Sequence, residues 1–272
     1  MRQIYFRNLL RYFHNNLHNV NRVNWWQTLR FNFMLLPFKT ACKLPFLLYG
    51  KCELGVLRGE VEFLHKPYKG MVKIGITDPF RSISTPSYIS ICGKMIVGKS
   101  VILRRGIRFS VIQLSNFLLN DCVTIGNNVN LYCAKEVVIG RATSVGNNTT
   151  IMDTDFHYVI NTATGLVKGN SLPIIIGDNN WIGGNCIIKK GTKTPKGTIV
   201  AGPYSMLSKD YTKLIPEYSL VAGSPAKLLV ENVRRVNNYD SENILAKYFK
   251  EHNEPFAFSG DIDDFCLPKY TI

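Results

Sequence analysis

The chain has 272 residues, with 33 Lys and Arg against 19 Asp and Glu, a formal net charge of +14 and a pI near 9.5. Hydrophobic residues make up 46% and charged residues 19%, which excludes general disorder and allows a substantial core. The positive excess predicts an anionic partner and leaves three classes open: nucleic acid, an acidic membrane surface or a phosphorylated small molecule.

Residues 1–70 are expected to form a helical or irregular cap. Within the first 50 residues, five arginines lie among many aromatic and aliphatic side chains, a pattern typical of one or two amphipathic helices. Two interpretations stay open: a cap that shields the open end of a repeat fold, and a basic aromatic surface that approaches anionic lipid. No run of about 18 apolar residues and no secretory signal are present, so we expect a cytoplasmic protein, at most peripheral at the inner membrane face.

Residues 71–230 repeat with a period of six. Aliphatic residues recur in four registers, with one aromatic: Ile91, Val97, Leu103 and Phe109; Leu119, Ile125, Leu131 and Val137; Ile139, Val145 and Ile151; Ile176, Ile182, Ile188, Val200 and Met206. A period of six fits neither the 3.6 of a helix nor the 2 of a half-buried strand. It fits a solenoid in which three short strands complete each triangular coil, and an ordinary β-sandwich is the alternative.

Three interruptions of this period predict departures from the coil. Ten residues separate Phe109 from Leu119, which predicts an extra loop or bulge of about four residues. A two-residue slip between Val137 and Ile139 predicts a second, smaller bulge. The register is lost between residues 151 and 176, so a loop at about 152–174 is expected to leave the coil, and long loops in compact repeats usually carry function.

The hexads of the form [LIV]-G-x4, together with residues 176–227 and their closing AGSPAK, resemble those of hexapeptide-repeat acyltransferases, in particular the acetyl-CoA-dependent O-acetyltransferases of bacterial sugars. This resemblance implies a mainly β fold, a left-handed parallel β-helix; the spacing alone does not show the hand. It also implies a homotrimer, acetyl-CoA as co-substrate and a saccharide acceptor, either free, nucleotide-linked or lipid-linked. The resemblance further implies that the protein functions in capsular or exopolysaccharide biosynthesis.

The loop at 152–174 holds the candidate chemistry. His157 is the only histidine of the repeat region, and imidazole is the usual general base near neutral pH. Asp153, Asp155 and His157 alternate, so an extended segment would direct all three to one side, where a carboxylate could orient the ring. The segment TDFH resembles the catalytic segment of the family, which implies His157 as base and favours Asp155 over Asp153 as its partner.

The acceptor site is expected to include Asp153 and Asn148, which lies on the preceding hexad; Asn148 could equally be a turn residue. The resemblance places the donor along the later coils, in a groove between subunits, with a backbone N–H near Gly183 facing the oxyanion. The residues implied for coenzyme A are Trp181, Gly183, Gly184, Lys190, Ala201, Gly202, Lys209 and Lys227. Trp181 could instead pack between coils, and each lysine could be an ordinary surface residue.

Other functions are compatible with a coil of this kind. N-acetylation of an amino sugar would share the same base and donor site, and a β-helix without catalysis could serve as an assembly module. A zinc hydratase on such a coil needs several histidines, and metal-ligand spacing is absent, so no metal is expected. No nucleic-acid-binding motif is present. The seven cysteines are expected to be reduced, and residues 231–272 form a C-terminal tail with one helix.

Overall fold

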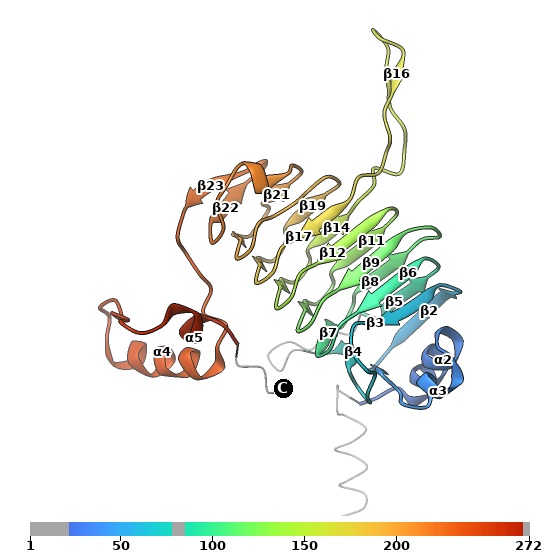
Figure 1. Ribbon diagram of the computed structural model, residues 1–272, viewed down its shortest axis with the longest axis horizontal. Coiled ribbons are helices and arrows are strands. Elements are labelled where there is room, and N and C mark those ends of the chain that lie inside the picture. Colours follow the sequence, from blue (N-terminus) through green and yellow to red (C-terminus); the bar gives the residue numbers. More distant parts are fainter. Residues whose placement is uncertain (1–21, 78–84, 269–272) are drawn as a thin grey trace, which may run out of the picture.

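The computed structural model of the protein describes residues 22–77 and 85–268. The expected amphipathic helix in the first 20 residues, with Arg2, Arg7 and Arg11, lies outside the described residues. Most of the described chain forms one triangular solenoid, in which successive strands pass from face to face along a common axis (Figure 1). No helix of the described residues is long and apolar enough to cross a membrane.

Three parallel sheets form the faces of the solenoid. The first contains β1 (Phe46–Leu48), β4 (Val72–Ile76), β7 (Val101–Arg104), β10 (Thr124–Ile125), β13 (Ser144–Val145), β18 (Trp181–Ile182), β20 (Ile199–Val200), β22 (Leu220–Gly223) and the antiparallel β23 (Ala226–Val230). The second contains β2 (Cys52–Leu57), β5 (Ser87–Ile91), β8 (Arg108–Val111), β11 (Asn130–Cys133), β14 (Thr150–Met152), β19 (Ile187–Lys189) and β21 (Met206–Leu207). The third contains β3 (Glu60–Phe63), β6 (Lys94–Val97), β9 (Asn116–Leu119), β12 (Glu136–Ile139) and β17 (Ile174–Ile176).

The strand pairing shows why the six-residue period appears in the sequence. Thr124 pairs with Ser144, and Ser144 pairs with Trp181, so equivalent positions of successive coils lie side by side. Short flat strands with inward aliphatic side chains stack in register and bury a continuous column. The fold is a parallel β-helix, as the resemblance implies, with a helical cap at its N-terminal end.

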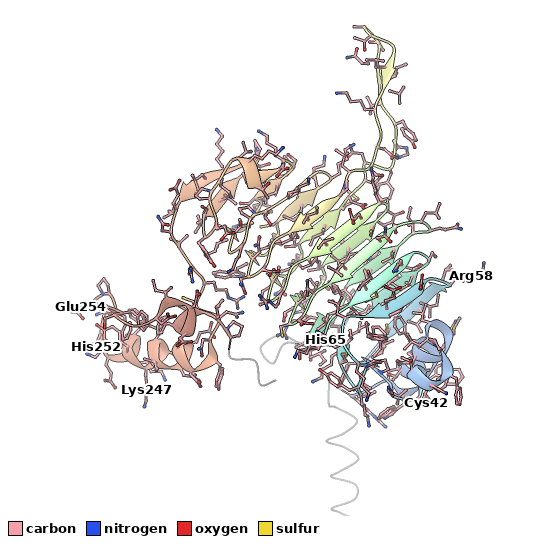
Figure 2. All side chains as sticks on the ribbon, in the orientation of Figure 1. Cys42, Arg58, His65, Lys247, His252 and Glu254 are labelled. Carbon is pink, nitrogen blue, oxygen red and sulfur yellow. The ribbon has the colours of Figure 1, made fainter. Side chains whose placement is uncertain are left out.

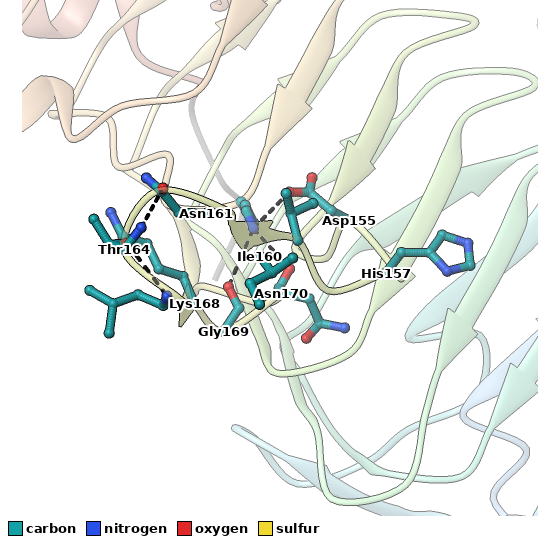
Figure 3. A pocket seen from close by; sticks show the side chains of 11 residues that line it. Asp155, His157, Ile160, Asn161, Thr164, Lys168, Gly169 and Asn170 are labelled. Atoms are coloured by element: carbon teal, nitrogen blue, oxygen red, sulfur yellow. Dashed lines mark hydrogen bonds and ion pairs between the residues drawn. The ribbon is translucent and has the colours of Figure 1, made fainter.

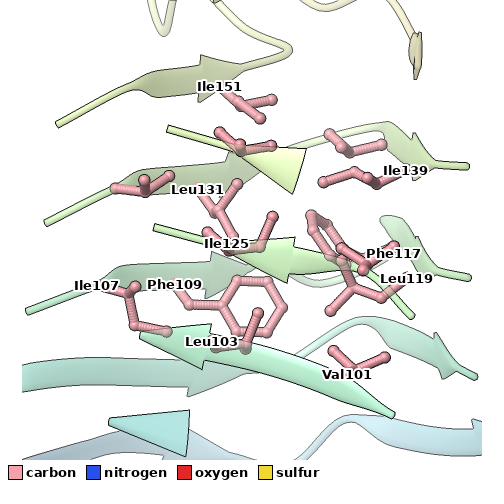
Figure 4. Packing of buried hydrophobic residues seen from close by; sticks show 14 of the residues in the cluster. Val101, Leu103, Ile107, Phe109, Phe117, Leu119, Ile125, Leu131, Ile139 and Ile151 are labelled. Carbon is pink, nitrogen blue, oxygen red and sulfur yellow. The ribbon is translucent and has the colours of Figure 1, made fainter. Parts of the chain in front are cut away.

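The aliphatic column fills the triangle along its length (Figure 4). Within a strand, alternate residues point inward; for example, Val137 and Ile139 are both almost fully buried on β12. The expectation of a bulge between these two residues is therefore wrong, since a single strand contributes two inward side chains. The corner after β8 spans 112–115 and is two residues longer than the matching corner at 134–135, so the insertion is smaller than the four residues expected; its tip, Leu114, is 92% exposed.

The corners depend on left-handed backbone. Asn128, Asn148 and Asn185 occupy the same corner in successive coils, with φ of +55°, +58° and +57°. Asparagine tolerates this conformation because its short polar side chain can form local hydrogen bonds. The Asn and Gly residues that follow the aliphatic position in each hexad therefore let the chain turn from the first face to the second.

The solenoid begins at Phe46, not at residue 71 as expected, because β1 pairs with β4 in parallel and β3 pairs with β6. The hexad pattern misses this first coil because its one aliphatic-Gly pair, Leu54-Gly55, lies inside β2, and because a longer connection separates β3 from β4. Two helices, α2 (Trp25–Leu35) and α3 (Phe38–Ala41), cover its open end. Phe31 of α2 packs edge-to-face against Phe46 at 5.0 Å between ring centroids.

Polar side chains of α2 complete the exposed edge of β1. Asn32 Nδ2 donates to the carbonyl oxygen of Phe46 at 2.8 Å, and its Oδ1 accepts from the Phe46 N–H at 3.2 Å. The hydroxyl of Thr28 accepts from the Leu48 N–H at 3.0 Å. An open strand edge is a pairing liability, and these buried side chains satisfy it in place of another strand.

The C-terminal residues follow the last coil. The 3-10 helix η1 (Tyr211–Lys213) precedes β22, and the chain after β23 leads to α4 (Tyr239–Glu251) and α5 (Ile262–Cys266). Arg234 lies over the Tyr218 ring at 3.8 Å from its centroid, which attaches this segment to the last coil. The seven cysteines are free, and four of them are buried.

Candidate active site

The long loop leaves the solenoid between the second and third faces, after β14, and returns at β17. Its outer part is a two-stranded hairpin, β15 (Ile160–Asn161) and β16 (Leu166–Val167), which projects far from the coil (Figure 1). The base of the loop is closed by the isolated bridge between Thr154 and Ser171 and by a hydrogen bond from the Leu172 N–H to the Asp153 carbonyl oxygen at 3.0 Å. The loop therefore has a fixed base and an exposed tip.

An ion pair attaches the loop to the coil. The Nζ atom of Lys190, which follows β19, lies 2.7 Å from Asp155 Oδ2, and Lys189 Nζ lies 3.7 Å from Oδ1. The hydrogen bond from Lys190, with the charges of both lysines, holds the pKa of Asp155 below its usual value. Lys190 also donates to the carbonyl oxygen of Asn170 at 3.2 Å, so one ammonium group contacts both sides of the loop.

The expected alternation of Asp153, Asp155 and His157 does not occur. Asp153 is fully buried, whereas the other two side chains are exposed. Phe156 has φ of +61° and its N–H donates to Thr154 Oγ1 at 3.0 Å, so the segment turns instead of running extended. Among the described residues, the Asp155 carboxylate pairs with lysines and has no hydrogen bond to the His157 ring.

The carboxylate of Asp153 is buried and hydrogen-bonded to the backbone of the neighbouring coil. Its Oδ1 accepts from the Ala134 N–H at 2.7 Å, and its Oδ2 accepts from the N–H groups of Lys135 and Glu136 at 2.7 and 2.8 Å. The carboxylate thus satisfies three backbone donors at the corner between β11 and β12. A fully buried carboxylate with three partners is not available to a sugar, which corrects the expected acceptor-binding role of Asp153.

His157 lies at the rim of a hollow of about 550 Å³ formed by the loop and Lys190. Its ring is exposed and extends away from Asp155 and Asn170 (Figure 3). Its own backbone N–H donates to the Asp155 carbonyl oxygen at 2.7 Å. Ile160, Leu166 and Lys168 are among the other lining residues, so the hollow has both apolar and cationic walls.

Asn148 is at the opposite end of β14 from the loop. Its Oδ1 accepts from Asn128 Nδ2 at 3.3 Å, and its backbone N–H donates to the Asn127 carbonyl oxygen at 2.8 Å. Its positive φ and these contacts are typical of a turn residue, which is one of the two roles that the sequence allows for Asn148. The side chain is exposed, and it does not line the hollow at His157.

The glycines expected to face coenzyme A face the neighbouring coil instead. A Cβ atom on Gly183 would lie 2.5 Å from the Gly202 nitrogen, and one on Gly202 would lie 2.5 Å from the Gly184 oxygen. A Cβ on Gly184 would lie 3.1 Å from the Asn147 oxygen. Close stacking of coils is thus sufficient to require glycine at 183 and 202. Ala201 is half-buried in the same stack, and its N–H donates to Val221.

The four other residues expected at the donor site lie in different places. Trp181 on β18 is 44% exposed, and the Arg235 guanidinium lies 5.2 Å from its ring centroid. Lys190 is engaged by the loop, so it does not face a phosphate in this structure. Lys209 follows β21 and Lys227 lies on β23, and both are exposed.

Two contributors to the loop were not found from the sequence. The Asn170 carbonyl oxygen accepts from the Asp155 N–H at 2.9 Å, and its Nδ2 donates to the Phe156 carbonyl oxygen at 3.1 Å. Tyr132 on β11 packs edge-to-face against Phe156 at 4.7 Å. No motif singles out either residue, because Asn170 acts through contacts with the opposite side of its own loop and Tyr132 acts through a contact from the neighbouring coil. In the described part of the chain, no group of three His, Cys, Asp or Glu residues could hold a metal ion.

No protein-family model matches the chain. The putative colanic acid biosynthesis acetyltransferase WcaF of Escherichia coli K12 is 28% identical over 137 residues, which cover 50% of this chain and 69% of that protein. The putative lipopolysaccharide biosynthesis O-acetyl transferase WbbJ of the same organism is 26% identical over 158 residues, covering 55% and 78%. The solved structure of the polySia-specific acetyltransferase NeuO aligns with a TM-score of 0.37 and 17% identity, over 76% of this chain and 94% of its own.

Proposed function

Because this chain belongs to the hexapeptide-repeat acyltransferases, we propose that it transfers an acetyl group from acetyl-CoA to a hydroxyl of a sugar, in capsular or exopolysaccharide biosynthesis. The observation that carries this proposal is the exposed imidazole of His157 at the rim of a hollow. That hollow is formed by the long loop that leaves the coil between β14 and β17. The names of the two relatives support a saccharide acceptor.

In the proposed reaction His157 is the general base. Its ring takes the proton of the sugar hydroxyl as the hydroxyl oxygen attacks the thioester carbonyl carbon. The tetrahedral intermediate then collapses, the carbon–sulfur bond breaks, and the imidazolium returns the proton to the coenzyme A thiolate. The products are the sugar ester and free coenzyme A, and no covalent acyl-enzyme forms.

Asp155 has a positioning role in this proposal. Its carboxylate is paired with Lys190, so it fixes the loop base instead of contacting the ring of His157. The backbone hydrogen bond between Asp155 and His157 carries that restraint to the histidine. A base on a rigid segment can be held close to the attacking hydroxyl, which is where most of the rate gain from proximity arises.

We place the acetyl-CoA along the later coils, with the exposed Lys209 and Lys227 available as point charges for its phosphates. The exposed outer face of β18, with Trp181, is the proposed wall for the pantetheine arm. His157 is exposed on a loop that projects from the coil, so a single chain forms only one wall around it. A homotrimer, in which a neighbouring copy supplies the second wall, completes the proposed site.

The test incubates the protein with acetyl-CoA and candidate bacterial saccharides and follows acetylation by mass spectrometry. His157→Ala is expected to lower turnover by about 10²- to 10⁴-fold with an unchanged melting temperature. His252→Ala, a histidine on the C-terminal segment, is the matched control and should retain full turnover. Near-normal turnover by His157→Ala would show that another group is the base.

The same products separate O-acetylation from N-acetylation. An O-acetyl ester is removed by mild alkali, whereas an N-acetyl amide survives it. Release of the acetyl group by mild alkali is the expected result. An alkali-stable product formed only with amino sugars would assign the site to N-acetyl transfer, and no product from any sugar with an intact acetyl-CoA supply would favour the non-catalytic assembly module.

A further inference from the structure

The α2 helix that closes the solenoid is apolar on its exposed side as well as on part of its buried side. Its buried side includes two polar side chains, Thr28 and Asn32, which hydrogen-bond to the edge of β1. Its exposed side is largely apolar. A helix that only capped a coil in water would present charged and polar residues to solvent. Covering the coil end therefore explains the inner face of α2 and leaves its outer face unexplained.

The outer face is large and aromatic. We define the α2–α3 outer face by its exposed apolar residues: Trp25, Trp26, Leu29, Phe33, Met34 and Phe38. Trp26 and Phe38 are each 74% exposed, and the rings of Phe33 and Phe38 lie 5.8 Å apart, so the patch continues from one helix to the next. Contiguous exposed apolar surface of this kind marks an interaction site rather than scattered surface residues.

The segment that forms this face carries charges of one sign. Residues 22–52 contain five basic residues and no Asp or Glu: Arg22, Arg30, Lys39, Lys43 and Lys51. Lys69, from the connection between β3 and β4, lies 5.6 Å from the Trp25 ring centroid. Arg30, Lys39 and Lys43 are exposed beside the apolar residues. A second copy of the chain docked on this face would bring like charges together, whereas an anionic surface would be attracted.

We propose that the α2–α3 outer face binds the surface of an anionic lipid bilayer, with its aromatic side chains in the interfacial region and its basic residues at the headgroups. Tryptophan is favoured at this depth because its ring is apolar and its N–H can remain hydrated. Lys and Arg side chains extend along the apolar surface to reach the phosphates. The helices lie along the membrane without crossing it, and this binding is independent of acetyl transfer.

The test uses the full chain and sedimentation with two kinds of vesicle, pure phosphatidylcholine and phosphatidylcholine with about 30% phosphatidylglycerol. The protein should sediment with the anionic vesicles only, and about 0.5 M NaCl should weaken that binding. The double substitution Trp26→Ser with Phe38→Ser should reduce binding at least about tenfold, since both side chains lose their interfacial burial. Arg30→Glu should reduce it about fivefold or more.

Matched controls come from the C-terminal segment, at the other end of the coil. Tyr239 is 76% exposed and Lys247 is exposed on α4, which lies far from Cys42 of the cap (Figure 2). Tyr239→Ser and Lys247→Glu should leave vesicle binding unchanged. Equal loss in these controls would show that binding follows total charge or apolar content and would overturn the assignment.

Fluorescence gives a second readout, which reports the surroundings of the tryptophan side chains. The chain has three tryptophans, so Trp181→Phe leaves Trp25 and Trp26 as the only reporters. Their emission should shift to shorter wavelength, with reduced acrylamide quenching, when anionic vesicles are added. Two other outcomes overturn the proposal: unchanged vesicle binding by the Trp26 and Phe38 double variant, and a smaller oligomer for that variant in sedimentation velocity, which would make the face a contact between copies.

Discussion

The ammonium group of Lys190 lies 2.7 Å from the carboxylate of Asp155 and joins the coil after β19 to the loop that carries His157. The same ammonium donates to the carbonyl oxygens of Gly169 and Asn170 on the returning side of the loop. One side chain therefore contacts both sides of the loop base, in addition to the main-chain hydrogen bonds that close it. Lys190 is only 23% exposed in its side chain, so this pair is better shielded from water than an ordinary surface ion pair.

Lys190→Met should lower the acetyl-transfer kcat/KM by about ten- to a hundredfold, because a loop displaced by an ångström no longer presents its base correctly. The unfolding free energy should fall by only about 1 kcal/mol, since the coil itself is intact. Lys193→Met is the matched control, because its ion pair with Asp210 at 3.8 Å does not touch the loop. Equal kinetic losses in both variants would contradict a positioning role for Lys190.

The stabilising effect of Asp155 should be lost at low pH. Lys190 lowers the pKa of Asp155 in the folded chain, so its stabilising contribution is complete above the ordinary aspartate value of about 3.9. The contribution is lost as the pH falls through the lower, folded value. The difference in melting temperature between the wild-type protein and Asp155→Asn should therefore be constant from neutral pH to about pH 5 and should vanish in stronger acid. A difference that grows on acidification would contradict this.

Asp153→Asn should destabilise the coil without acting on the acceptor. The carboxamide keeps one oxygen but turns an NH₂ group toward backbone N–H donors that now lack a partner, at a cost of about 2–3 kcal/mol. Denaturant unfolding should show this loss, and Asp155→Asn, on the exposed side, should show a smaller one. An Asp153→Asn variant with native stability and a raised KM for the sugar would restore the acceptor-binding role.

The coil was predictable from the sequence because its determinants repeat. Each hexad places an aliphatic residue inward and a Gly or Asn at a corner, so a few local rules specify most strands from Ser87 onward. The first coil, from Phe46, was not found, because its one aliphatic-Gly pair is not part of a regular series of hexads and a longer connection follows β3. A repeat pattern in the sequence cannot indicate such a coil, because its strands become evident only from their pairing with the strands of the second coil.

The loop was located correctly in the chain, but the directions of its side chains were not. Alternation holds only for extended backbone, and the positive φ of Phe156 breaks it between Asp155 and His157. Burial of Asp153 depends on three N–H groups at the corner between β11 and β12, about 20 residues earlier in the chain. Lys190 was expected to meet a phosphate because its charge was visible in the sequence, whereas its carboxylate partner was not.

Gly183 offers a direct test of coil stacking against donor binding. Gly183→Ala places a Cβ 2.5 Å from a backbone nitrogen of the next coil, which cannot move aside as a flexible side chain could, so the unfolding free energy should fall by about 1–3 kcal/mol. Gly169→Ala is the matched control, because its Cβ would meet nothing within 4 Å and its φ needs no glycine. Denaturant unfolding measures both, and the KM for acetyl-CoA is measured on the folded protein. A Gly183→Ala variant of native stability with a raised KM for acetyl-CoA would show that the ligand, and not the neighbouring coil, requires glycine at this position.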